Sequence, residues 1–270
     1  MSKFTKSISI IGTIALTSTL MLGSSVLAAA TPTASLTQSK QTTTSSKQLA
    51  SVSNQFATWM DVYLFPAPHG GIKALDTVTP MYKSQGGVTL SGEQAYAMLF
   101  AADLHARYSF AHLWRYAQTE FGRNGLMHAE IAANGKVLQS QSFARADLDM
   151  ALSLLIAGQT WHDKAYTAAG VKMANAVYEH EVNSLHQVMN SDGGSHRVPF
   201  GALYLPTSDF AYLAKETGNN GWLAVGKVNG ASMAAIQERI AAAVKMEPKN
   251  TGMNATLKLW SDVLRIQQQM

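Results

Sequence analysis

Apolar residues recur at helical spacing over most of the chain after residue 47, and this pattern constrains the fold more than any other feature. One face of the first such segment carries five of them: Phe56, Trp59, Met60, Val62 and Tyr63. Pro66 and Pro68 should end this helix. Later segments with the same period predict helices at residues 91–104, 108–121, 146–158, 162–185, 208–217, 231–244 and 254–268. Helices joined by short links pack as hairpins, so the pattern predicts an all-α array of helical hairpins.

Three shorter segments add detail to this array. Ser91 precedes Gln94 by three residues at the start of an apolar run, and this spacing predicts a capping box on the second helix. The dipeptide Asn134-Gly135 lies between two apolar segments and favours the positive φ of a tight turn. We therefore expect one short β-hairpin there and no other β-structure. Residues 69–90 contain several glycines but no sustained period, which indicates a long loop of the kind that often carries function.

The first 30 residues have the features of a secretory signal peptide. Lys3 and Lys6 supply a positive start, a short apolar run follows, and the small residues up to Ala30 offer a cleavage site. Residues 31–47 are rich in Ser, Thr and Gln, which predicts a disordered spacer. Residues 48–270 should form one domain, large enough to bury its own core. No later segment reaches the roughly 20 apolar residues of a membrane span, so we expect a secreted protein without one.

Composition excludes several classes of function. The chain has no cysteine, so thiol catalysis and disulfides are ruled out. Removal of Lys3 and Lys6 leaves 19 of the 21 basic residues against 17 acidic ones, without a basic stripe, so nucleic acid is not an expected partner. His180 and His186 do not have the spacing of a zinc-binding HExxH helix, and the glycine pairs lack the lysine of a phosphate loop. We expect no metal and no cofactor.

Two segments carry a specific resemblance to a known family. Residues 91–99 read Ser-Gly-Glu-Gln-Ala-Tyr-Ala-Met-Leu, and residues 110–116 read Phe-Ala-His-Leu-Trp-Arg-Tyr. Together they are similar to the segment SEGQGYGML…FDRLWRW of glycoside hydrolase family 8. Residues 147–157 and Trp161 resemble the later part of the family signature that begins A-[ST]-D-[AG]-D, in the same spacing. Weaker similarity extends over residues 55–222.

This resemblance implies both a fold and an activity. The family consists of secreted bacterial endoglucanases, chitosanases, lichenases and xylanases on an (α/α)6 toroid. The helical array is therefore expected to be toroid-like, and incomplete at its C-terminus because the resemblance fades after Trp222. The implied activity is that of a glycosidase that hydrolyses a β-1,4-linked polysaccharide, with an acid and a water-activating base.

The resemblance also implies site residues. Glu93, one position after the family's acid, is the candidate acid, and Asp147 is the candidate cleft carboxylate. Asp147 and Asp149 lie two residues apart on a helix, so at most one of them faces a shared site. The candidates for substrate binding are Tyr96, Trp114, Asp149 and Trp161. Each candidate also has a purely structural interpretation, as a first-turn acid at a helix N-terminus or as a core aromatic residue.

Three departures from the family motifs leave a second function open. Gly92 stands where the family has its acid, and Arg145 stands where it has an active-site Asp. No segment after Trp222 resembles the region that furnishes the base. The alternative is a catalytically degenerate relative that binds polysaccharide or serves as an exported accessory protein. An incomplete toroid would expose apolar helix faces, which would favour a homodimer.

Overall fold

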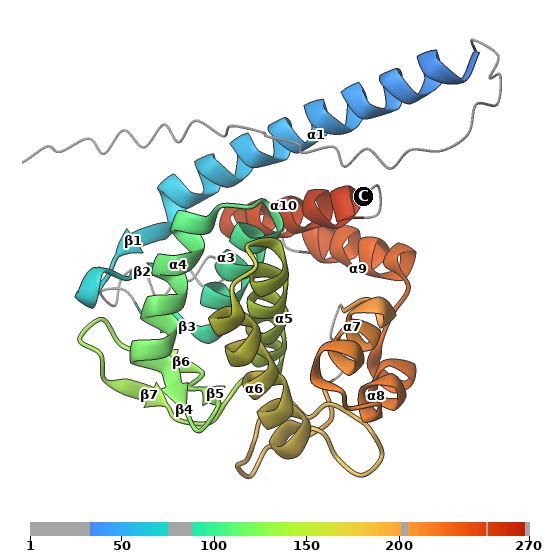
Figure 1. Cartoon of the computed structure of the whole chain (residues 1–270). Coiled ribbons are helices and arrows are strands. Elements are labelled where there is room, and N and C mark those ends of the chain that lie inside the picture. Colours follow the sequence, from blue (N-terminus) through green and yellow to red (C-terminus); the bar gives the residue numbers. More distant parts are fainter. Residues whose placement is uncertain (1–32, 75–87, 201–204, 247, 268–270) are drawn as a thin grey trace, which may run out of the picture. The chain divides into compact units, whose positions relative to one another are not determined.

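The computed structural model describes residues 33–74, 88–200, 205–246 and 248–267. The chain divides into two units, Met1–Gln41 and Thr42–Met270, and the second contains the packed helices (Figure 1). The predicted signal peptide and most of the predicted loop at residues 69–90 fall outside the described residues. Within the described ranges, no helix combines the length and the apolar character that crossing a bilayer requires.

The first helix, α1, runs over Thr33–Tyr63. Its predicted apolar face is buried at Phe56, Trp59 and Tyr63, whereas Val62, predicted on the same face, is 50% exposed. The indole N–H of Trp59 donates a hydrogen bond to Thr256 Oγ1 at 3.0 Å, so the end of α1 contacts the last helix.

The N-terminal turns of α1 include residues 33–47, for which the sequence predicts a disordered spacer. Helical hydrogen bonds are internal to the segment that makes them. A polar stretch can therefore extend a helix whose later turns are anchored by packing. The structure differs from the prediction in this stretch.

The remaining helices follow at short intervals along the chain. They are α3 (Ser91–Asp103), α4 (Arg107–Tyr116), α5 (Ala144–Thr160), α6 (Lys164–Glu181), α7 (Thr207–Thr217), α8 (Gly221–Asn229), α9 (Met233–Met246) and α10 (Thr251–Gln267). A π-helical turn, Ala117–Phe121, continues α4. Helix α5 packs between α3 and α6, while α7 pairs with α8 and α9 with α10 (Figure 1). Helix α5 is buried on nearly all sides, and its buried residues are apolar apart from Arg145, Asp147, Asp149 and Ser153. The predicted helices are confirmed; the pattern does not predict α8, in which glycines interrupt the period.

The start of α3 differs from the predicted capping box. Ser91 is the first helical residue, and no side chain caps the helix. Gln94 is buried instead, and its side-chain oxygen accepts a hydrogen bond from Ala74 N–H at 2.8 Å. Its side-chain nitrogen donates to Ile72 O at 3.0 Å and to Leu113 O at 2.9 Å. Gln94 therefore ties α3 to α4 and to the short strand β2 (Ile72–Ala74).

Three small antiparallel sheets accompany the helices in the described part of the chain. Strand β1 (Leu64–Pro66) pairs with β2, and β4 (Gly122–Arg123) pairs with β5 (Leu126–Met127). Strand β6 (Glu130–Ile131) pairs with both β3 (Thr89–Leu90) and β7 (Val137–Gln139). The predicted hairpin, β6–β7, is confirmed, but the expectation of no other β-structure is wrong. Positive φ at two consecutive positions occurs at Asn124-Gly125, at 49° and 88°, between β4 and β5, and at His69-Gly70, at 56° and 70°, between β1 and β2. Strands of two or three residues are too short to show a period in the sequence.

Candidate active site

A cavity of about 550 Å³ opens beside the first turn of α3. Its walls come from this turn, from β6, β7 and the link that follows β7, and from the loop at residues 190–196. The lining includes two carboxyl side chains, Glu93 and Glu130, together with carboxamides, hydroxyls and the ring of Tyr96. Such a mixture of an apolar ring with several hydrogen-bonding groups suits a polar organic ligand.

The pairing of β3, β6 and β7 aligns three side chains along one wall of this cavity. Leu90 lies opposite Glu130, and Glu130 lies opposite Gln139. Residues directly opposite each other project from the same face of a sheet, and all three line the cavity. The sequence does not identify Glu130 as a site residue, because it belongs to no motif and only the strand pairing brings it beside α3.

Glu93 lies in the first turn of α3, lines the cavity and is only 3% exposed. Its charge also reaches the end of α1, where burial and then Glu93 raise the pKa of Tyr63. The neighbouring Gly92 lines the cavity as well. A Cβ at Gly92 would lie 3.5 Å from the ring of Phe143, an ordinary contact, so a Cβ fits at this position without displacing its neighbours.

Asp147 lies behind the cavity wall, in the first turn of α5, and is 0% exposed. Its Oδ1 accepts a hydrogen bond from Met127 N–H at 3.0 Å. Burial, followed by the charge of Glu181, raises the pKa of Asp147 well above its usual range. The predicted cleft carboxylate is therefore an interior group in this structure.

Arg145 and Asp149 form a buried ion pair one helical turn apart, with Nε and Oδ2 2.6 Å from each other. The guanidinium carbon lies 5.8 Å from the ring centre of Tyr96 and 5.0 Å from that of Trp260. Burial raises the pKa of Asp149 even though Arg145 acts in the opposite direction. Asp149, a predicted substrate-binding residue, is thus held in the core by Arg145.

A smaller cavity of about 180 Å³ is lined by Arg145, Asp209 and Trp260, among others. Burial raises the pKa of Asp209 to about 7; Asp149 adds to this shift and Arg145 opposes it. In this cavity, Arg145 therefore lies with an acidic side chain, Asp209, and an aromatic one, Trp260.

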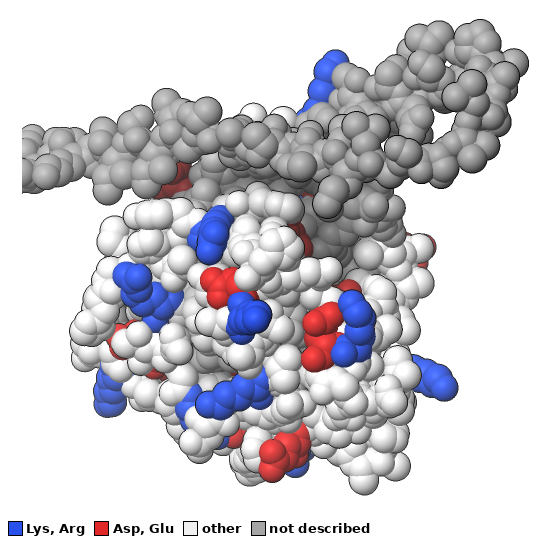
Figure 2. Space-filling model, viewed as in Figure 1, with Lys and Arg blue, Asp and Glu red and all other residues white. Residues whose placement is uncertain are grey.

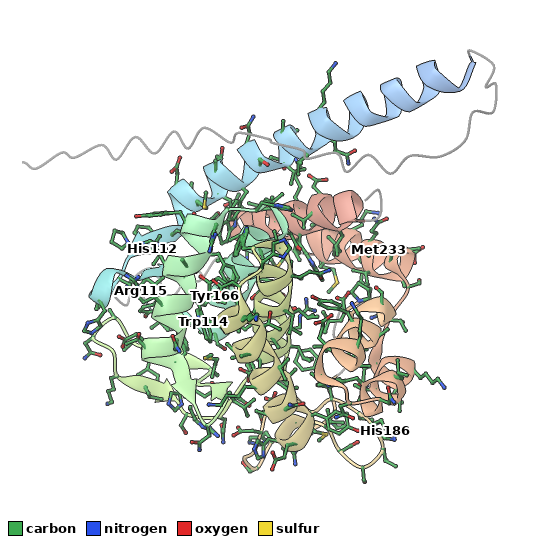
Figure 3. The ribbon with its side chains drawn as sticks, in the orientation of Figure 1. His112, Trp114, Arg115, Tyr166, His186 and Met233 are labelled. Atoms are coloured by element: carbon green, nitrogen blue, oxygen red, sulfur yellow. The ribbon has the colours of Figure 1, made fainter. Side chains whose placement is uncertain are left out.

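The three predicted aromatic residues lie in different places. Tyr96 lines the 550 Å³ cavity, whereas Trp114 lines a separate cavity of about 280 Å³. Trp161 packs edge-on against Phe110 and Tyr166, at ring-centre distances of 5.2 and 6.1 Å. Trp114 and Tyr166 both appear on the left of the view, with α4 (Figure 3). The structure therefore brings together Glu93 and Tyr96, but neither tryptophan joins them.

Charged side chains of both signs are interspersed on the face of the molecule seen in Figure 2. Most of that surface between them is uncharged. Charge on this face therefore does not single out a ligand site, and the cavity beside α3 is the stronger indication.

Comparison with curated proteins finds similarity to a glycoside hydrolase family and to endoglucanases. A family model described as Glycosyl hydrolases family 8 matches residues 80–255. The chain is 33% identical over 103 residues to an endoglucanase of Salmonella typhi, covering 35% of this chain and 28% of that one. It is 28% identical over 144 residues to endoglucanase A of Acetivibrio thermocellus, covering 50% of this chain and 30% of that one. The chain thus spans less than a third of the length of these two relatives.

Solved structures show the same fold. A β-1,3-1,4-glucanase from Paenibacillus sp. X4 matches with a TM-score of 0.59 and 21% identity, covering 74% of this chain and 53% of that one. An endo-β-1,4-glucanase from Acetobacter xylinum matches with a TM-score of 0.53 and 20% identity, covering 71% and 58%. These matches confirm the predicted all-α, toroid-like fold. Since the family model also matches well over half of the chain, this protein is a member of glycosyl hydrolase family 8.

Proposed function

We propose that this protein hydrolyses a β-1,4-linked polysaccharide of the glucan class. The two curated relatives described above are endoglucanases, and the two solved structures described above are glucanases. The observation that carries the proposal is the cavity in which Glu93, Glu130 and Tyr96 meet carboxamide and hydroxyl side chains. Carboxyl groups supply the acid and the base of glycoside hydrolysis, and an aromatic ring can stack on the apolar face of a sugar.

In the proposed reaction, Glu93 donates a proton to the glycosidic oxygen while the bond between that oxygen and the anomeric carbon breaks. Glu130 accepts a proton from the water molecule that attacks the anomeric carbon on the opposite face. The products are two shorter sugar chains, one with an inverted anomeric centre. Asp147 supports the cavity from behind its wall in this assignment, and Asp149 acts by holding Arg145.

We include export in the same proposal, because an enzyme must leave the cell to reach a polymeric glucan. The features of a signal peptide at residues 1–30 support it. The homodimer expected for an incomplete toroid also remains a prediction.

Polysaccharide binding without turnover is the second candidate function. Two observations favour it: Gly92 has no carboxyl at the motif's acid position, and Arg145 replaces the motif's Asp with a buried cation. In this alternative the cavity holds a sugar, and the protein acts as an exported accessory protein.

The test measures the reducing ends that the purified protein releases from carboxymethylcellulose, lichenan, xylan and chitosan. We expect Glu93→Gln and Glu130→Gln each to lower the rate by about 100-fold or more, because each removes one partner in proton transfer. Glu179→Gln is the matched control, since that side chain is 74% exposed. Affinity for the polymer, measured by calorimetry, should change little in the two cavity variants.

The outcomes separate the two candidate functions. Hydrolysis that survives both cavity variants contradicts the assignment of Glu93 and Glu130. Binding without any release by the unmutated protein supports the second function. A folded protein that neither binds nor cleaves any of the four polymers refutes both.

A further inference from the structure

Two carboxyl groups lie buried behind the cavity wall, one at the start of α5 and one at the end of α6. Asp147 and Glu181 are both 0% exposed. Asp147 Oδ1 accepts a hydrogen bond from Met127 N–H at 3.0 Å, and Glu181 Oε1 accepts one from the hydroxyl of Ser142. Their second oxygens, Oδ2 and Oε2, have no hydrogen-bond partner among the described residues.

One proton shared by the two carboxyl groups would give both of these oxygens a hydrogen-bond partner. An ionised carboxylate only accepts hydrogen bonds, whereas a protonated carboxyl group also donates one. A proton between the two groups satisfies both free oxygens and removes one of two buried like charges. We propose that Asp147 and Glu181 share a proton, and that this pair positions the cavity wall through Ser142.

The electrostatic surroundings favour retention of the proton. Burial, followed by the charge of Glu181, raises the pKa of Asp147 well above its usual range. Burial likewise raises the pKa of Glu181 to about 8, and its hydrogen bond to Ser142 and its close contact with Asp147 oppose the shift. The other charged groups that face the pair are Asp192, which raises both pKa values, Arg123, which lowers that of Asp147, and Arg197, which lowers that of Glu181.

Ser142 connects the pair to the cavity, which it lines. Its hydroxyl donates to Glu181 and accepts a hydrogen bond from Asp192 N–H at 2.9 Å. Its own N–H donates to Asp192 Oδ1 at 2.9 Å. Asp192 belongs to the loop at residues 190–196 and is also paired with Arg123. The network therefore joins two walls of the cavity to the buried pair.

Loss of the shared proton places two negative charges side by side in the interior. Their repulsion separates the pair and loosens Ser142 and the loop at residues 190–196. The pKa of Glu181 rises from 4.5 to about 8 on folding, so the folded protein binds more protons than the unfolded chain between these pH values. The contribution of this proton to the stability of the fold is therefore fully present below about pH 4.5 and is lost as the pH rises towards 8.

Glu181→Gln tests this directly. The amide nitrogen can donate to Asp147 Oδ2 while the amide oxygen accepts from Ser142, so a fixed hydrogen replaces the shared proton. Both proteins carry Asp209→Asn, because the pKa of Asp209 is raised to about 7 and would add its own pH dependence. Between pH 5 and 8, the unfolding midpoint of the protein with Glu181 should fall by about 5 °C more than that of Glu181→Gln. Equal slopes overturn the proposal.

Hydrogen exchange of the loop at residues 190–196 gives a second readout. After correction for the intrinsic rate, exchange in the protein with Glu181 should increase about tenfold or more from pH 7 to pH 9, and that in Glu181→Gln should not. Asp147→Asn repeats the test if Glu181→Gln does not fold, since its amide can donate to Glu181 Oε2. A loop whose exchange is unchanged between pH 7 and 9 in the unmutated protein overturns the proposal without any variant.

The role of the wall in sugar binding rests on the proposed function, but neither of these measurements requires a sugar. Unfolding and exchange can therefore confirm the shared proton in a protein that cleaves no polysaccharide. Conversely, hydrolysis of a polysaccharide by a protein whose loop exchange does not change with pH would support the proposed function and reject the shared proton.

Discussion

The ion pair between Arg145 and Asp149 leads to a quantitative prediction, because both side chains are almost fully buried. Their exposed fractions are 5% and 1%, and the charged atoms are 2.6 Å apart. Removal of one partner from such a pair costs about 3–5 kcal/mol, since the remaining charge stays buried without a counter-ion. We therefore expect Asp149→Leu to lower the free energy of unfolding by about 3–5 kcal/mol.

Arg145→Met should cost less than Asp149→Leu, about 3 kcal/mol. Burial already raises the pKa of Asp149, so without Arg145 this carboxyl can take up a proton instead of remaining charged. The variant also loses the contacts of the guanidinium with Tyr96 and Trp260, which the methionine sulfur partly replaces. The double variant removes both charges of the pair and roughly conserves volume, so it should lie within about 2 kcal/mol of the unmutated protein.

Urea unfolding at pH 7, followed by circular dichroism, measures all three variants. Lys215 and Glu216 provide a control pair, with an N–O distance of 3.2 Å and side chains 72% and 23% exposed. Substitution of one partner in that exposed pair should cost about 0–1 kcal/mol. Single losses below about 1 kcal/mol at Arg145 and Asp149, or a double variant that loses the sum of the singles, would refute the reasoning.

Three further substitutions test the site and the packing. Gly92→Glu should raise the release of reducing ends by about 100-fold if an acid at the motif position limits the rate, while Gly92→Gln should not; equal rates contradict this explanation. Gln94→Leu removes three hydrogen bonds, two buried and one partly buried, and should lower the free energy of unfolding by about 2–4 kcal/mol in urea; a loss below about 1 kcal/mol would count against its linking role. Gly170→Ala would place a Cβ 2.8 Å from Leu155 Cγ and 3.0 Å from its backbone nitrogen, so it should cost about 1–3 kcal/mol. Gly193→Ala, with nothing within 4 Å, is its control and should stay within about 0.5 kcal/mol.

Local pattern was sufficient for most of the helices and for the family, but not for α8 or the first turns of α1. Helical spacing depends only on neighbours along the chain, so it correctly identified the buried face at Phe56 and Trp59 and the limits of most helices. The motif around Gln94 and the signature that ends at Trp161 led to family 8 for the same reason, since both are continuous in sequence. Where a side chain had a choice of partners, local reasoning was insufficient: Gln94 fits a capping box in sequence, yet it binds the backbone of β2.

The composition of the candidate site was decided by tertiary structure. The sequence by itself determined that Glu93 and Tyr96 share the first turns of one helix. In the structure, both residues line the cavity. It could not determine that Glu130 joins them, because that depends on the pairing of β6 with β3. Nor could it show that Asp147 is interior. Its burial depends on segments that are distant in sequence, among them the end of α6, where Glu181 is hydrogen-bonded to Ser142. Periodicity reports which face of a helix is apolar; which residues from distant segments meet at that face is set by packing.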